Sequence, residues 1–106
     1  MAWFILIIAG LLEIVWAYAM KQSDGFTKLW PSAITIVTMI MSFALLSWAM
    51  RSLPLGTAYT VWTGIGAVGA FAVGIFFLHE PANATRILAA VLILGGLVLM
   101  KLSTPV

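Results

Sequence analysis

The chain has 106 residues, of which 64% are hydrophobic and only 8% are charged, and its formal net charge is +2. A soluble domain carries about 25% charged residues, so this composition indicates an integral membrane protein, with residues 1–106 forming a single four-helix transmembrane domain. The small positive charge forms no basic patch, which excludes nucleic-acid binding, and the absence of cysteine excludes disulfides and thiolate metal sites.

The first apolar segment, residues 2–20, reads AWFILIIAGLLEIVWAYAM and is long enough to cross a bilayer as a helix. Its one charged residue, Glu13, lies roughly 16 Å along the helix axis from Ala2, which is near the middle of the bilayer. A carboxylate at that depth is costly and by default marks a functional site. We expect the segment to be retained rather than cleaved as a signal peptide, because no basic residue precedes it and Glu13 interrupts it.

Gly10, Glu13 and Trp16 share one broad face of this helix. The glycine allows another backbone to approach, and the indole ring supplies an aromatic wall. No lysine, arginine or histidine lies at the depth of Glu13 in any segment, so the carboxyl group has no ion-pair partner within its own chain. It therefore either holds a proton or meets a cation from outside, which is the minimal chemistry of an exchange site.

The second segment, residues 30–50, carries a polar stripe in an otherwise apolar span. Its members are Thr35, Thr38 and Ser42. Such hydroxyl groups either bond the backbone of their own helix or face a site. Ser42, near the middle of the segment, is the best candidate for a hydrogen bond with Glu13.

The third segment, residues 57–78, carries Tyr59 and Trp62 three positions apart, so that their rings share a helix face. Tyr59 also fits the membrane interface, whereas Trp62 lies deeper. Aromatic faces beside a carboxylate suit a delocalised or alkylated cation through cation–π attraction. Three glycines follow: Gly64, Gly66 and Gly69. Because glycine weakens a helix, this cluster indicates either tight helix packing or a bending point.

The fourth segment, residues 84–102, has Gly95 and Gly96 among large apolar residues. A helix without a site residue but with a patch of small residues is typical of an association surface, so we expect it to pack against its copy in a dimer. His79 and Glu80 precede this segment. We expect both to be helix-end groups at the interface rather than proton carriers.

The loops carry nearly balanced positive charge. Four spans place both termini and the middle loop on one side, with Arg51 and Lys101, whereas the other side has Lys21, Lys28 and Arg86. Lysine and arginine in the loops set orientation, and a difference of one charge sets it weakly. The sequence therefore predicts insertion in both orientations and an antiparallel, dual-topology homodimer.

The four spans, the glutamate in GLLEIVWA and the stretch LPLGTAYTVWTGIGAVGA together resemble the small multidrug resistance transporters, over nearly the whole chain. Trp16 with Ser42 points to their guanidinium-exporter branch, and Gly10 and Lys101 also fit that branch. The resemblance implies an antiparallel homodimer in the bacterial inner membrane that exports cations against protons by alternating access. It also implies a shared substrate and proton site, whose positions in this sequence are Glu13, Trp16, Ser42, Tyr59 and Trp62.

Thr60 departs from the pattern, because the branch usually has alanine between the tyrosine and the valine of this motif. We expect a β-branched hydroxyl residue beside Tyr59 to alter the packing around the portal or hinge and to relax the selectivity for the cation. We expect a proton/guanidinium antiporter, with substituted guanidines as further substrates. The alternatives are a broader quaternary-ammonium exporter of the same family, a small dual-topology ion channel and, least favoured, a rotary-ATPase ring subunit. We expect no enzymatic activity and no cofactor, because no nucleophile–base pair or metal cluster is visible.

Overall fold

The computed structural model describes residues 1–104, and these form four helices joined by short turns. The helices are α1 (Ala2–Gln22), α2 (Leu29–Ala49), α3 (Leu55–Leu78) and α4 (Ala84–Ser103). Each of them is long and apolar enough to cross a membrane. The prediction of an all-α membrane protein with four spans is confirmed over this part of the chain.

The helix ends follow the local chemistry and differ slightly from the predicted bounds. α1 continues beyond residue 20 as far as Gln22, and Ser23 then closes it by donating from Oγ to the carbonyl of Met20 at 2.6 Å. α3 begins at Leu55 rather than at residue 57, because Pro54 has the extended backbone of an N-cap. Proline lacks the N–H that an interior helical position would need, so it suits a position just before the first turn.

The turn between α3 and α4 is also defined by its caps. His79 has a left-handed backbone with φ of 58°, and the N–H of Glu80 donates to the carbonyl of Gly74 at 3.0 Å. This bond and the left-handed residue at the C-cap close the end of α3. The Asn83 side chain then accepts a bond from the N–H of Arg86 at 2.9 Å and so caps the start of α4.

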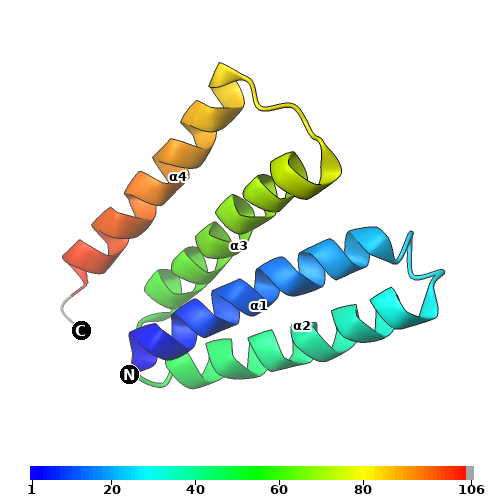
Figure 1. Cartoon of the computed structure of the whole chain (residues 1–106). Helices are drawn as coiled ribbons and strands as arrows, with labels where there is room; N and C mark the ends of the chain where they lie inside the picture. Colours follow the sequence, from blue (N-terminus) through cyan, green and yellow to red (C-terminus); the bar gives the residue numbers. More distant parts are fainter. Residues whose placement is uncertain (105–106) are drawn as a thin grey trace.

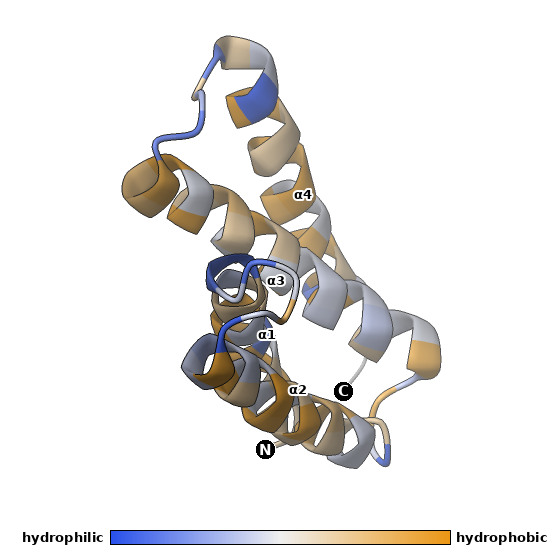
Figure 2. Ribbon diagram, turned by 90° about the vertical axis from the view of Figure 1, so that its right-hand side faces the viewer, coloured by the Kyte–Doolittle hydropathy of each residue, from blue (hydrophilic) through white to orange (hydrophobic). Residues whose placement is uncertain are grey.

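The helices form an uneven bundle (Figure 1). α1 lies between α2 and α3, and α4 packs mainly on α3, with Lys101 near its end reaching Trp3 of α1. The start of α1 and the end of α4 lie at the same end of the molecule, as an even number of spans requires. Figure 2 shows hydrophilic residues gathered at the turns and hydrophobic residues along the helices, which is the distribution that a bilayer demands.

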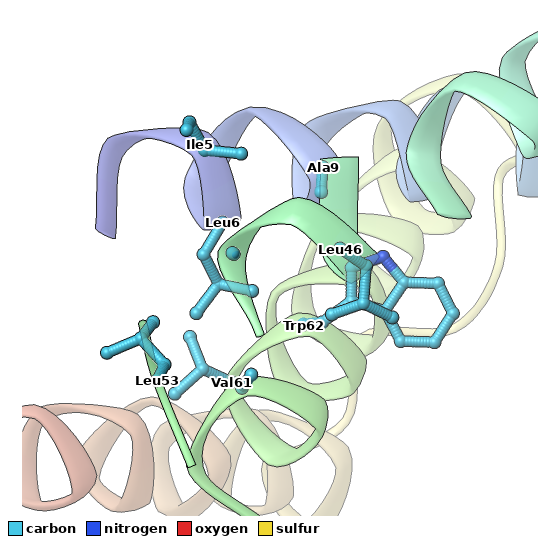
Figure 3. Packing of buried hydrophobic residues seen from close by; sticks show 9 residues of the cluster. Ile5, Leu6, Ala9, Leu46, Leu53, Val61 and Trp62 are labelled. Atoms are coloured by element: carbon cyan, nitrogen blue, oxygen red, sulfur yellow. The ribbon is translucent and has the colours of Figure 1, made fainter. Parts of the chain in front are cut away.

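The hydrophobic core lies at one end of the bundle, where the start of α1, the end of α2 and the start of α3 meet (Figure 3). Its members are all buried: Ile5, Leu6, Ala9, Leu46, Ala49, Leu53, Ala58, Val61 and Trp62. The other halves of α1 and α3 line two cavities of about 400 Å³ and 580 Å³. Between α1 and α3, the subunit is therefore closed at one end and open at the other.

Candidate functional site

The carboxyl group of Glu13 lies against α3 at Gly66. A Cβ atom added to Gly66 would overlap this carboxyl group, so the missing side chain is what makes room for it. Oε1 of Glu13 is buried, and nothing in residues 1–104 forms a hydrogen bond with it. A buried polar group without a partner costs about 1–3 kcal/mol. The arrangement therefore favours a proton or an external cation at this oxygen.

Trp16, one turn further along α1, contains a second unpaired polar atom. Its indole Nε1 is buried and has no hydrogen-bond partner among the described residues. Its ring meets the ring of Phe43 edge to face, with 6.3 Å between the centroids. Buried polar atoms nearly always have a partner in native proteins. A donor and an acceptor left unpaired on neighbouring turns of α1 indicate that a ligand, water or a second chain completes the site.

Ser42 does not bond Glu13 in this structure, in contrast to the expectation from the sequence. Its Oγ donates to the carbonyl of Ala9 at 2.7 Å and accepts from Nε1 of Trp62 at 2.9 Å. Ala9 lies one helical turn before Glu13, so Ser42 reaches the backbone of that turn instead of the carboxyl group. These two buried bonds join α1, α2 and α3 at one point.

The other two hydroxyl groups of the polar stripe form hydrogen bonds with the backbone of α2 itself. Thr35 donates to the carbonyl of Pro31 at 2.7 Å, and Thr38 donates to the carbonyl of Ile34 at 2.6 Å. Both are the local i to i−4 bonds that hydroxyl residues commonly make in helices. Of the three hydroxyl groups in the stripe, only that of Ser42 takes part in a described bond to another helix.

Four aromatic rings form a continuous row beside these groups. From Trp16 the row passes to Phe43, then to Trp62 with 5.6 Å between centroids, and then to Tyr59 with a further 5.6 Å. Tyr59 and Trp62 are therefore adjacent, as their spacing predicts. Trp62 is only 6% exposed, whereas Tyr59 is 53% exposed and forms the outer end of the row. Phe43 is not among the predicted site residues, because nothing in the sequence distinguishes it from the other phenylalanines of the chain.

Close packing accounts for the other glycines near the site. A Cβ atom added to any of them would press on a side chain of another helix: Ile65 at Gly10, Leu97 at Gly64 and Ile14 at Gly69. α3 runs as an uninterrupted α-helix through all of its glycines. These contacts support tight packing as one role of the glycine cluster.

The remaining predicted residues lie elsewhere. Thr60 is exposed and lines a third cavity, of about 480 Å³, between α3 and α4. Nζ of Lys101 lies 4.7 Å from the centroid of the Trp3 ring, near the start of α1. Gly95 and Gly96 have nothing within 4 Å of an added Cβ, so their surface is open. No cluster of acidic, histidine or cysteine side chains able to hold a metal ion occurs within residues 1–104.

The sequence is similar to known proteins over nearly its whole length. The family model described as Small Multidrug Resistance protein matches residues 1–93. Curated relatives from Citrobacter freundii and Salmonella typhimurium, each named "Guanidinium exporter", are 60% identical over 104 residues, which is 98% of this chain and 99% of the relative. The relative of the same name from Escherichia coli (strain K12) is 59% identical over the same shares of the two chains.

Proposed function

The chain belongs to the small multidrug resistance family, and from this membership we propose that it is a proton-coupled antiporter that exports guanidinium across the inner membrane of a bacterium. The observation that carries the proposal is the buried oxygen of Glu13, which has no hydrogen-bond partner within residues 1–104. The names of the relatives, at 60% identity over nearly the full length, support guanidinium as the cation.

The chemistry of guanidinium suits the groups around Glu13. The cation is planar and delocalised, it presents paired N–H donors that match the two oxygens of a carboxylate, and it stacks on aromatic rings. Glu13 would bind the cation, and Tyr59 and Trp62 would line its path with ring faces. Trp16 would orient the carboxylate through its free Nε1–H, and Ser42 would do so through the Ala9 turn and Trp62.

Competition for the Glu13 carboxylate would couple the flux of protons to the flux of guanidinium. A proton and guanidinium each neutralise the same carboxylate, so binding of one favours release of the other. In each transport cycle the site would face the two sides of the membrane in turn. The difference between the closed end and the open end of the subunit fits such alternating access.

We further propose that the working unit is an antiparallel homodimer. The near balance of loop charges allows insertion both ways. The open surface at Gly95 and Gly96 allows two copies of α4 to approach closely. A second Glu13, from the inverted copy, would then complete the site that is left unpaired here.

Two other functions make different predictions. In a broader quaternary-ammonium exporter, which the departure at Thr60 suggests, a tetraalkylammonium ion would compete with guanidinium for uptake. In an ion channel, guanidinium flux would rise linearly with concentration and would need no proton gradient. A guanidinium exporter gives saturable, proton-coupled uptake that tetraalkylammonium ions inhibit weakly.

Uptake of guanidinium into liposomes tests the proposal, with the native protein compared with Glu13→Gln. Glutamine keeps the shape of the side chain but cannot take up or release a proton, so we expect proton-coupled uptake to fall to the level of empty liposomes. Asp24→Asn is the matched control, because it removes a carboxylate from the exposed turn after α1 and should leave uptake unchanged. Coupled transport by Glu13→Gln at the native rate would overturn the central role of Glu13.

A further inference from the structure

Far from Glu13 in sequence, the chain already holds a guanidinium group in a small site of its own. Nη2 of Arg86 lies 3.6 Å from Oε1 of Glu80, and its Cζ lies 5.1 Å from the centroid of the Phe71 ring. The side chain of arginine ends in a guanidinium group. A carboxylate and an aromatic face thus surround this group, and the same two partners are proposed for the free cation at Glu13.

The carboxylate of this site is held in place by the backbone. The N–H of Glu80 donates to the carbonyl of Gly74 at 3.0 Å, and His79 adopts the left-handed conformation that turns the chain back. A Cβ atom added to Gly74 would overlap the carboxyl group of Glu80, so the glycine gives this group its place against α3. Phe71 lies three residues before Gly74 on the same helix, so α3 supplies both the aromatic ring and the surface against which the carboxylate of Glu80 lies.

The site lines the part of a cavity that is nearest the turn between α3 and α4. This cavity of about 400 Å³ is lined by residues of α1 and α3, among them Ile14 and Ala67, which directly follow Glu13 and Gly66 in the sequence. Glu80, Phe71 and Arg86 line the same cavity. The carboxylate of Glu80 and the residues next to Glu13 thus share one cavity.

The ion pair of Arg86 with Glu80 is weak, so another cation can take the place of the Arg86 side chain. The side chains of Arg86 and Glu80 are 36% and 42% exposed, and ion pairs of that exposure contribute only about 0–1 kcal/mol. The charged groups that line this cavity are Glu80, Arg86 and Lys21. With Arg86 in place the cavity carries a positive balance that opposes a cation, and without it one carboxylate faces one lysine.

We propose that Glu80 and Phe71 form a second guanidinium-binding site in this part of the cavity, and that Arg86 occupies it as a tethered competitor of the transported cation. Free guanidinium displaces the Arg86 side chain for a moment as it passes between the cavity and the surrounding water. This inference rests on guanidinium being the substrate. The second site binds free guanidinium only weakly while the Arg86 side chain occupies it.

Binding of guanidinium to protein without the central carboxylate tests the second site alone. Isotope-labelled full-length protein in detergent carries Glu13→Gln, with or without Arg86→Ala, and guanidinium chloride replaces sodium chloride at constant ionic strength. We expect saturable chemical-shift changes at the amides of Phe71 and Glu80 only when Arg86 is replaced. Addition of Glu80→Gln should abolish them.

Lys101→Ala is the matched control in the same Glu13→Gln background. It also removes a positive charge that lies over an aromatic ring, but within residues 1–104 no carboxylate forms an ion pair with Lys101, so it should create no saturable response. The inference is overturned if Arg86→Ala gives no saturable shift, if Glu80→Gln leaves that shift intact or if Lys101→Ala produces the same shift. Native transport of guanidinium alongside any of these results would reject the second site but not the proposed function.

Discussion

At the scale of single residues, Gly66 determines where the carboxyl group of Glu13 can lie. The side chain of Glu13 occupies the space that a Cβ atom of residue 66 would take. A methyl group there would force the carboxylate away from α3, and crowding of this kind typically costs about 1–3 kcal/mol. Gly66 is thus a positioning residue for the proposed transport site.

We predict that Gly66→Ala lowers kcat/KM for guanidinium uptake at least about tenfold, which corresponds to about 1.4 kcal/mol. Gly56→Ala is the control, because an added Cβ at Gly56 meets nothing within 4 Å. Uptake into liposomes measures both variants. If crowding at the carboxylate is the cause, the shorter side chain in Glu13→Asp should restore part of the uptake of Gly66→Ala, whereas a general loss of folding would not be rescued.

Glu13 could be identified from the sequence, but its surroundings could not. A single carboxylate in a long apolar helix is anomalous whatever packs around it, because the bilayer makes any such charge costly. The bond of Ser42 to Ala9, by contrast, depends on the rotation and depth at which α2 meets α1. Spacing along one helix does not determine that register, so Ser42 was predicted to reach the carboxyl group and instead reaches the backbone one turn away.

At the scale of the helices, the buried bonds of Ser42 hold three elements together. The Trp62 indole donates to Ser42, and Ser42 donates to the backbone of α1. Removal of the hydroxyl group would leave the indole N–H of Trp62 buried without an acceptor. This junction lies beside the hydrophobic core, at the closed end of the subunit.

Ser42→Ala should therefore lower the free energy of unfolding by about 1–2 kcal/mol, the range found for hydrogen bonds between membrane helices in model peptides. Thr38→Ala removes a hydroxyl group that bonds only its own helix and should change stability by no more than about 0.5 kcal/mol. Equilibrium unfolding in mixed detergent with increasing sodium dodecyl sulfate compares the two. Equal losses would mean that the junction does not hold the helices together.

Four helices could be predicted because long apolar runs leave the backbone no other way to satisfy its polar groups in lipid. Their exact ends and neighbours needed the structure. The start of α3 at Leu55 depends on the local conformation of Pro54. The row of rings depends on how the Phe43 ring of α2 meets the rings of Trp16 and Trp62. Neither property is visible in hydropathy.

At the scale of the whole molecule, the subunit has two different ends and one poorly covered helix. The core fills the end where α1 and α3 begin, two cavities lie towards the other end, and α4 packs mainly on α3. α4 has no buried residue. Such a helix fits a subunit whose packing is completed by another copy of the chain.

We predict that insertion in both orientations is necessary for transport. Gln22→Lys changes the loop charges from three against two to four against two, and the triple variant Lys28→Gln, Ser52→Lys and Ser103→Lys changes them to two against four. Each variant alone should insert mainly one way and lose most guanidinium uptake. Production of both variants in one cell should restore it, as measured by uptake and by accessibility of a terminal tag. Native uptake by either variant alone would contradict the antiparallel pair.

Because α4 makes few contacts within the subunit, transport by the proposed pair should depend on how many chains the membrane contains. A pair held mainly by one helix face forms by mass action in the plane of the bilayer, so its abundance depends on how many chains share that bilayer. In a cell with few copies, most chains would be single and their Glu13 sites incomplete. Guanidinium tolerance should then rise with the square of the copy number at first, and become proportional to it only when nearly every chain has found an inverted partner.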